Sequence, residues 1–187
     1  MKEKAFESQH CSLHFRSSLK SQRLRGEILP SKYIQDLLEV VNLELFGRGQ
    51  LARELNFKGV EGVLINFQLC GAKKIVSLNK KFRHKNKITD VLSFPIYQSL
   101  RRGRGDKNLS TFLDLGDIIV CHEIAIRQAR EFMISYPEEI IHLFIHGLLH
   151  LLGYDHEQTS REEKIMFEHE ARLVKAVYRR IRKWKKA

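Results

Sequence analysis

The chain has 187 residues, of which 43% are hydrophobic and 29% charged, and its formal net charge is +11. This length and balance suit one globular domain, residues 1–187, with a sizeable core, and no apolar run approaches the ~20 residues of a membrane span. The three cysteines include no C-x-x-C pair, which argues against a disulfide framework and favours a cytoplasmic protein without a membrane partner.

The positive charge is concentrated in three clusters. They are Lys80–Lys87, Arg101–Lys107 and the run Ala171–Ala187, which holds eight basic residues and no acid. Any one of these clusters could be a solvated face. Together they favour an anionic polymer as partner.

The N-terminal half of the chain alternates between strand and helix signals. Residues 1–9 are polar, and we expect them to be disordered. Cys11–Phe15 alternates loosely as a first strand, and a helix with apolar residues at helical spacing opens at Ser31. Gly47–Gly49 breaks the helical pattern, and the secondary-structure signal up to Gly59 is weak. Val63–Leu69 is β-rich and closely apolar, which indicates a buried strand.

The middle of the chain predicts two more strands. Ile75–Phe82 has helical spacing, and Thr89–Phe94 reads as a strand that Pro95 stops. Residues 96–113 form a long loop, and loops of this length are often functional. Leu115–Val120 is the next strand, and a helix follows it.

The C-terminal part is helical. Ser135 and Glu138 have the S-x-x-E pattern of a capping box, and the helix that they open is apolar nearly all round. We expect it to be the central buried helix. A final helix follows, with residues 171–187 as a basic extension. About four strands surrounded by helices give an α+β, or mixed α/β, domain built on a small mixed sheet.

Three histidines lie at relative positions 1, 5 and 11 of the segment His146–His156. His146 and His150 are four residues apart, so on a helix they share one face. Gly153 can adopt a left-handed conformation that ends the helix, and the chain can then return His156 to the same place. Three imidazoles make an open site for one Zn²⁺ ion, which we predict on the central helix.

The same spacing occurs in the metzincin signature H-E-x-x-H-x-x-G-x-x-H, in which the Glu is the general base of a protease. The chain has Gly147 at that position, so the metal ligands are kept and the peptidase base is missing. His142 lies one turn before His146. A ladder of three histidines would span about 12 Å of helix axis, too long for one ion, so we expect His142 to support or pack against the site.

Several segments together resemble the YbeY endoribonuclease family. His146–His156 reads H-G-L-L-H-L-L-G-Y-D-H and fits the family's metal motif at every fixed position. Leu78–Arg83 with Thr89–Pro95 resembles its second block, and Leu115–Ile119 resembles its third. The resemblance covers roughly residues 60 to 160.

The resemblance implies a zinc-dependent endoribonuclease specific for single-stranded RNA. It would act in maturation of small-subunit (16S) ribosomal RNA and in ribosome quality control, with ribosomal RNA and the small ribosomal subunit as partners. Arg83 fits the position of an arginine that the family requires, and a guanidinium can hold two phosphate oxygens. Arg83 and His146 are thus the candidate catalytic residues, and the oligomeric state stays open.

Two other functions use the same residues. One is a zinc metalloprotease-like hydrolase, which the spacing supports and Gly147 opposes. The other is a non-catalytic ribosome-binding factor with structural zinc, although three ligands with an open position differ from the usual four-ligand structural site. No carboxylate is an obvious general base. Attack by water and attack by the RNA 2′-hydroxyl are both open.

Overall fold

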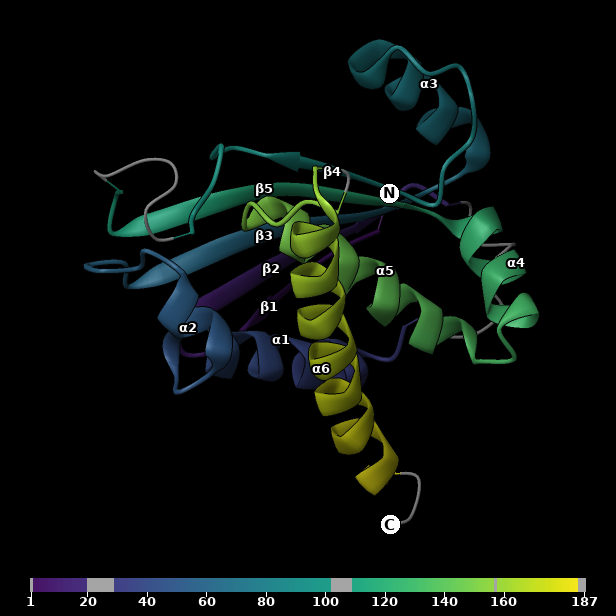
Figure 1. The fold of residues 1–187 in the computed structure, drawn as a ribbon. Coiled ribbons are helices and arrows are strands. Elements are labelled where there is room, and N and C mark those ends of the chain that lie inside the picture. The colour runs from purple at the N-terminus through teal and green to yellow at the C-terminus, as the bar shows by residue number, and fades with distance from the viewer. Residues whose placement is uncertain (1, 20–28, 102–108, 157, 185–187) are drawn as a thin grey trace.

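In a computed structural model, the protein forms one mixed five-stranded sheet in the order β1-β2-β3-β5-β4 (Figure 1). The structure describes residues 2–19, 29–101, 109–156 and 158–184. The strands are β1 Lys2–Glu7, β2 Cys11–Ser17, β3 Gly62–Cys70, β4 Val91–Pro95 and β5 Phe112–Cys121. Strands β2, β3 and β5 are parallel, and β1 and β4 pair antiparallel at the two edges. The α+β class is therefore confirmed.

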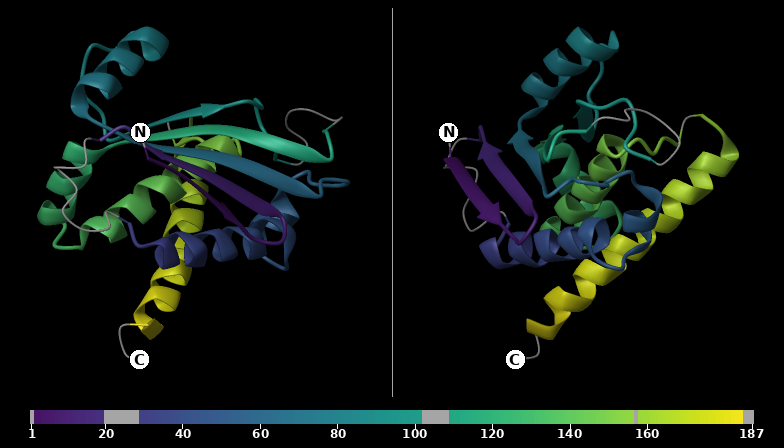
Figure 2. Two further views of the ribbon diagram at one scale, coloured as in Figure 1. Left: turned by 180° about the vertical axis from the view of Figure 1, so that it is seen from behind. Right: turned by 90° about the vertical axis from the view of Figure 1, so that its left-hand side faces the viewer.

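The helices lie on both sides of the sheet (Figures 1 and 2). They are α1 Ser31–Phe46, α2 Gln50–Glu54, α3 Ala72–Arg83, α4 His122–Glu131, α5 Tyr136–Leu151 and α6 Ser160–Trp184. Helices α1 and α5 pack on one face, and α6 crosses outside them. Helix α3 lies on the other side, where Ile75 packs with Leu92 and Ile119 in a second, smaller core.

Helix α5 is the buried helix that its sequence predicts. Ser135 and Glu138 form the expected capping box, in which the Ser135 backbone N–H donates to Oε2 of Glu138 at 2.9 Å. Apolar side chains on several sides of the helix are fully buried, among them Ile140, Phe144 and Leu149. The helix therefore fixes whatever it carries to the rigid core.

The expected disorder of the N-terminal residues was wrong. Residues 2–7 are not disordered but form β1, which pairs along its whole length with β2. The pairing satisfies the backbone groups of β1 that face β2, and Phe6 packs against the core. With this edge strand the sheet has five strands, one more than the approximate count from the sequence.

The final helix runs without a break from Ser160 to Trp184. Its apolar stripe is buried at Met166, Leu173, Val177 and Ile181, so at least the first half of the basic segment 171–187 belongs to the domain. Most of the basic loop Arg101–Lys107 lies outside the described residues. In the part of the chain that the structure describes, no helix combines the length and apolarity needed to cross a membrane.

Candidate metal centre

The side chains of His146, His150 and His156 meet at the C-terminal end of α5. Each offers one ring nitrogen, and these three nitrogens lie within 4.8 Å of one another. Nε2 of His146 is 3.2 Å from Nε2 of His150. Two nitrogens bound tetrahedrally to one Zn²⁺ at ~2.0–2.1 Å would be about 3.3 Å apart, so this pair fits such an ion closely. The three histidines could thus hold a metal ion.

The turn after α5 returns His156 to the other two histidines. Gly153 has φ +91°, the left-handed conformation that its place in the motif predicts. The Gly153 N–H donates to the His150 carbonyl and the Tyr154 N–H to the Leu149 carbonyl, both at 3.0 Å. This pair of bonds is a Schellman motif, which ends the helix and satisfies its last carbonyls.

Gly147 lets α5 approach the sheet closely beside the histidines. A Cβ atom at this position would lie 2.7 Å from Cγ2 of Ile118 and 3.0 Å from Oγ of Ser93. Both distances are shorter than an ordinary van der Waals contact. The position that carries the general base in metzincins therefore has no room here for a side chain.

Glu170 of α6 orients His146. Its Oε1 lies 3.3 Å from Nδ1 of His146, so the imidazole can donate from Nδ1 and keep Nε2 for a metal. Burial alone would raise the pKa of Glu170, but its contacts with His142 and His146 outweigh burial and lower that pKa to about 2. Glu170 is consequently a carboxylate at neutral pH.

Sequence reasoning missed Glu170. A signal was available, because Glu170 occupies a position of the apolar stripe of α6 between Met166 and Leu173 and is buried there. Asp155, next to His156, accepts a hydrogen bond from Gln158 at 3.1 Å and acts electrostatically on His150.

His142 supports the centre from outside the cluster of three. Its Nε2 lies 2.9 Å from Glu170, and its Nδ1 lies 3.6 Å from the carboxylate of the fully buried Glu139. These two carboxylates, Glu139 first, raise the pKa of His142 to about 10. By contrast, burial and then the neighbouring histidines lower the pKa of His150 to about 4, which leaves its imidazole neutral and able to bind a metal.

Tyr154 connects the turn that carries His156 to α2, a segment for which the sequence gave no clear secondary structure. Its hydroxyl donates to Glu54 at 2.7 Å, and Nε2 of His169 lies 3.0 Å from the same carboxylate. The Tyr154 ring is buried, with the Arg101 guanidinium 4.5 Å from its centroid. Arg101 also pairs with Glu162. The segment 46–58 thus contributes to the rigidity of the turn.

An open cleft of about 820 Å³ adjoins the histidines. It runs between the end of α3, the edge strand β4 and the turn after α5. Besides the three histidines it is lined by Phe82, Arg83, Thr89, Asp90, Val91, Ser93, Phe94, Pro95, Gln98, Gly153, Tyr154, Asp155 and Gln158. Arg83, chosen from the sequence for phosphate binding, therefore shares one cleft with the predicted metal ligands.

Asp90 of the cleft has a structural role. Its Oδ1 accepts from the Val91 N–H at 2.8 Å, and its Oδ2 accepts from Gln128 at 2.9 Å. Burial opposes ionisation of Asp90, but these hydrogen bonds outweigh it and lower its pKa. The Asp90 carbonyl also accepts from the Cys121 N–H at 2.7 Å, so Asp90 adjoins β5 directly before β4 begins at Val91.

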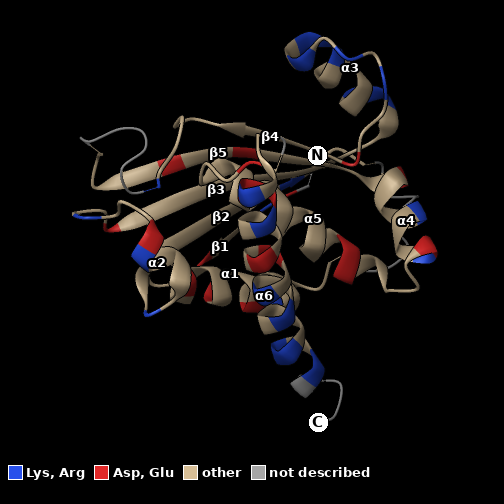
Figure 3. Cartoon of the chain, in the orientation of Figure 1, with Lys and Arg blue, Asp and Glu red and all other residues tan. Residues whose placement is uncertain are grey.

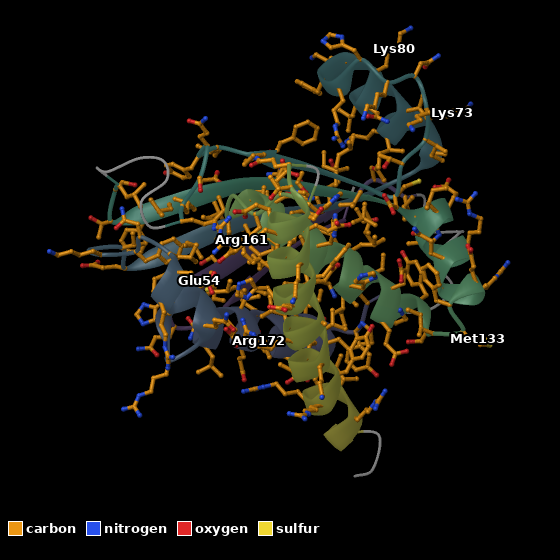
Figure 4. All side chains as sticks on the ribbon, in the orientation of Figure 1. Glu54, Lys73, Lys80, Met133, Arg161 and Arg172 are labelled. Carbon is orange, nitrogen blue, oxygen red and sulfur yellow. The ribbon has the colours of Figure 1, made fainter. Side chains whose placement is uncertain are left out.

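Basic side chains gather on α3 and along α6 (Figure 3). On α3, Lys73 and Lys80 project away from the body of the molecule (Figure 4). On α6, Arg172 pairs with Glu44, and Arg180 pairs with Glu39 and lies 3.9 Å from Asp36. Part of the positive charge of α6 is thus neutralised by acids of α1.

Comparison with known proteins gives a consistent result. A family model described as Endoribonuclease YbeY matches residues 42–178. Endoribonuclease YbeY of Persephonella marina is 38% identical over 122 residues, which are 65% of this chain and 75% of that protein. Endoribonuclease YbeY of Thermotoga maritima is 32% identical over 157 residues, 83% of this chain and 88% of its own length. The solution structure of TM1509 from Thermotoga maritima has a TM-score of 0.53 and 31% identity, and covers 84% of this chain and 89% of its own.

Proposed function

The chain belongs to the YbeY endoribonuclease family, and on this premise we propose that it is a zinc-dependent endoribonuclease that cuts single-stranded RNA. The observation that carries the proposal is the position of Arg83 in one cleft with His146, His150 and His156. A phosphodiester in this cleft would have a guanidinium at one side and a metal-binding cluster at the other.

The donor set supports zinc as the ion. Neutral imidazoles are ligands that Zn²⁺ prefers, and three protein ligands leave a position open to solvent or substrate. His150 is held neutral by burial, and His146 is oriented by Glu170. When bound, such an ion supplies Lewis acidity and lowers the pKa of water.

The residues of the chain have separate tasks in this mechanism. Arg83 binds the scissile phosphate and neutralises the charge that grows on its oxygens, which lowers the barrier because that contact strengthens in the transition state. Glu170 holds the His146 ring in one orientation, and Gly147 and Tyr154 fix the backbone around it. No carboxylate of the cleft is assigned as general base, so the nucleophile can be water or the RNA 2′-hydroxyl.

The proposed substrate is ribosomal RNA of the small subunit, handled in the cytoplasm during 16S maturation and ribosome quality control. The net charge of +11 and the exposed lysines of α3 support a polyanionic partner. A metalloprotease is disfavoured because a side chain at Gly147 would meet Ile118. A purely structural zinc is disfavoured because the three histidines line an open cleft.

Purified protein tests the proposal directly. Zinc content is measured together with cleavage of a single-stranded oligoribonucleotide, its duplex and an unstructured protein. We expect one zinc per chain, cleavage of the single strand alone, and loss of cleavage with a chelator and in His150→Ala. Cleavage that survives metal removal would contradict the metal dependence, and hydrolysis of the protein substrate would favour the protease.

A further inference from the structure

Phe82 is a large apolar side chain exposed beside the proposed reaction centre. It lies on the last turn of α3, directly before Arg83, and 53% of it is exposed. Both residues line the cleft that holds the histidines. Single exposed apolar side chains are common, so exposure alone does not mark Phe82. Its place in the cleft, next to Arg83 and with a face that a ligand can cover, does.

The ring is held in place by its neighbours. Its centroid lies 5.1 Å from that of Phe94 on β4, with the two rings 67° apart, an edge-to-face contact. Nζ of Lys81 lies 5.0 Å from the Phe82 centroid. Phe94 and Pro95 continue an apolar wall along the same side of the cleft. Phe82 is therefore a positioned ring with the Lys81 ammonium over one of its faces, and a base would stack on the opposite face.

This combination matches one element of single-stranded RNA. Proteins bind such strands by stacking unpaired bases on aromatic rings while cations follow the phosphates. A phosphate bound at Arg83 carries a nucleoside on each side, and the neighbouring side chain is within reach of one of its bases. A base inside a duplex is already stacked and cannot take this position without leaving its helix.

We propose that Phe82 is the platform on which the nucleobase next to the scissile phosphate stacks, and that this contact selects single-stranded over paired RNA. The proposal rests on the proposed function, because it assumes an RNA phosphate at Arg83. It assigns Phe82 to substrate binding and not to the chemical step. Arg83 retains the chemical role.

The test compares Phe82→Leu, which keeps apolar volume, with Phe82→Trp, which keeps a stacking surface. Phe132→Leu is the matched control, because Phe132 is also 53% exposed but does not line the cleft. Binding and single-turnover cleavage are measured on a short single-stranded oligoribonucleotide and on the same strand with one abasic nucleotide beside the cleaved bond. Thermal unfolding checks that each variant is folded.

We expect Phe82→Leu to weaken binding by roughly 10-fold to 100-fold, the range typical of one stacked base, and to change the saturated rate only a few-fold. Phe82→Trp should restore binding, and its added fluorescence should fall when RNA is bound, after subtraction of the signal of Trp184. On the abasic strand, wild type and Phe82→Leu should bind alike.

Three results would overturn the inference. The first is that Phe82→Leu binds the intact strand as tightly as wild type does. The second is that Phe82→Leu loses the same affinity for the intact and the abasic strand. The third is that Phe132→Leu loses as much RNA affinity as Phe82→Leu. In each case cleavage by the wild type would leave the proposed function standing. If the wild type neither binds nor cuts single-stranded RNA, the proposed function fails and the inference with it.

Discussion

Oε1 of Glu170 lies 3.3 Å from Nδ1 of His146, and this contact joins α6 to the metal-binding face of α5. Although α6 has few contacts with the sheet, it contributes to the histidine site through this carboxylate. The carboxylate fixes the tautomer and the orientation of the ring, so that Nε2 faces the other histidines. The geometry of the centre thus depends on packing between two helices.

Loss of the Glu170 charge should weaken metal binding. Glu170→Gln keeps an acceptor for Nδ1 of His146 but removes the negative charge, and loss of such a partner typically costs ~10–100-fold in metal affinity. Competition with a chromophoric zinc chelator measures the change. Glu168→Gln, at an exposed position of the same helix, is the control and should bind as wild type. Equal affinity in Glu170→Gln and wild type would remove Glu170 from the site.

His142 should make stability depend on pH between about 6.5 and 10. Its pKa is raised from 6.5 to about 10 in the folded protein, so its contribution is fully present below 6.5 and is lost as the pH rises through 10. Urea unfolding of metal-free wild type and His142→Gln measures this. The gap between the two midpoints should be largest near pH 6 and close toward pH 10; a gap that is constant with pH would refute the assigned ionisation.

Much of the candidate site could be predicted from the sequence because local geometry determines it. The spacing of His146 and His150 places both on one helical face, and Gly153 in the left-handed conformation returns His156. Each of these relationships spans a few residues. The grouping of Arg83 with them came from the family resemblance, since Arg83 and His146 are 63 positions apart in the sequence.

The features of the site and fold that the sequence did not predict depend on contacts between elements that are distant in the chain. Glu170 reaches His146 only because α6 packs on α5, and Tyr154 reaches Glu54 across 100 positions of sequence. Strand β1 could not be recognised from its polar residues, because its stability comes from pairing with β2 at the sheet edge. The pairing of Arg172 and Arg180 with acids of α1 likewise could not be predicted from the basic C-terminal sequence, because the partners lie far away in the chain.

Gly147→Ala should destabilise the protein although alanine is the better helix former. The new methyl group would lie 2.7 Å from Cγ2 of Ile118, and overpacking of this kind typically costs ~1–3 kcal/mol, more than the ~1 kcal/mol that alanine gains in a helix. Urea unfolding measures the loss. Ile118→Val removes a different methyl and should not compensate, whereas Ile118→Ala removes Cγ2 and should recover part of the loss in a double-mutant cycle. Additivity of the two changes would show that no clash occurs.

The exposed cations of α6 should contribute RNA affinity without affecting the chemical step. Lys175, Arg179 and Arg182 are exposed, so their joint change to Gln should weaken RNA binding and flatten its salt dependence as fewer counterions are released. The saturated single-turnover rate should stay the same. Arg180→Gln is the contrasting control, because it breaks contacts with α1 and should lower stability more than the salt slope. A large fall in the saturated rate of the folded triple variant would contradict this division.

Arg83 should affect the rate far more than binding. If its guanidinium neutralises charge that develops on the scissile phosphate, Arg83→Ala should lower the saturated cleavage rate by ~10²–10³, as loss of one such donor typically does. Arg83→Lys should restore little, since an ammonium cannot make the two-pronged contact. Zinc content and fold should be unchanged, and RNA should bind within a few-fold of wild type.

Lys81→Ala is the matched control for Arg83, because it removes a neighbouring cation of the same helix turn that is not among the residues lining the cleft. It should reduce affinity modestly and leave the saturated rate near wild type. Single-turnover cleavage at saturating enzyme separates the two effects, since it reports the step after binding. Normal cleavage by Arg83→Ala, or loss of its zinc, would end the role assigned to Arg83. An equal fall of the saturated rate in Lys81→Ala would show that general positive charge, and not the specific guanidinium contact of Arg83, drives the reaction.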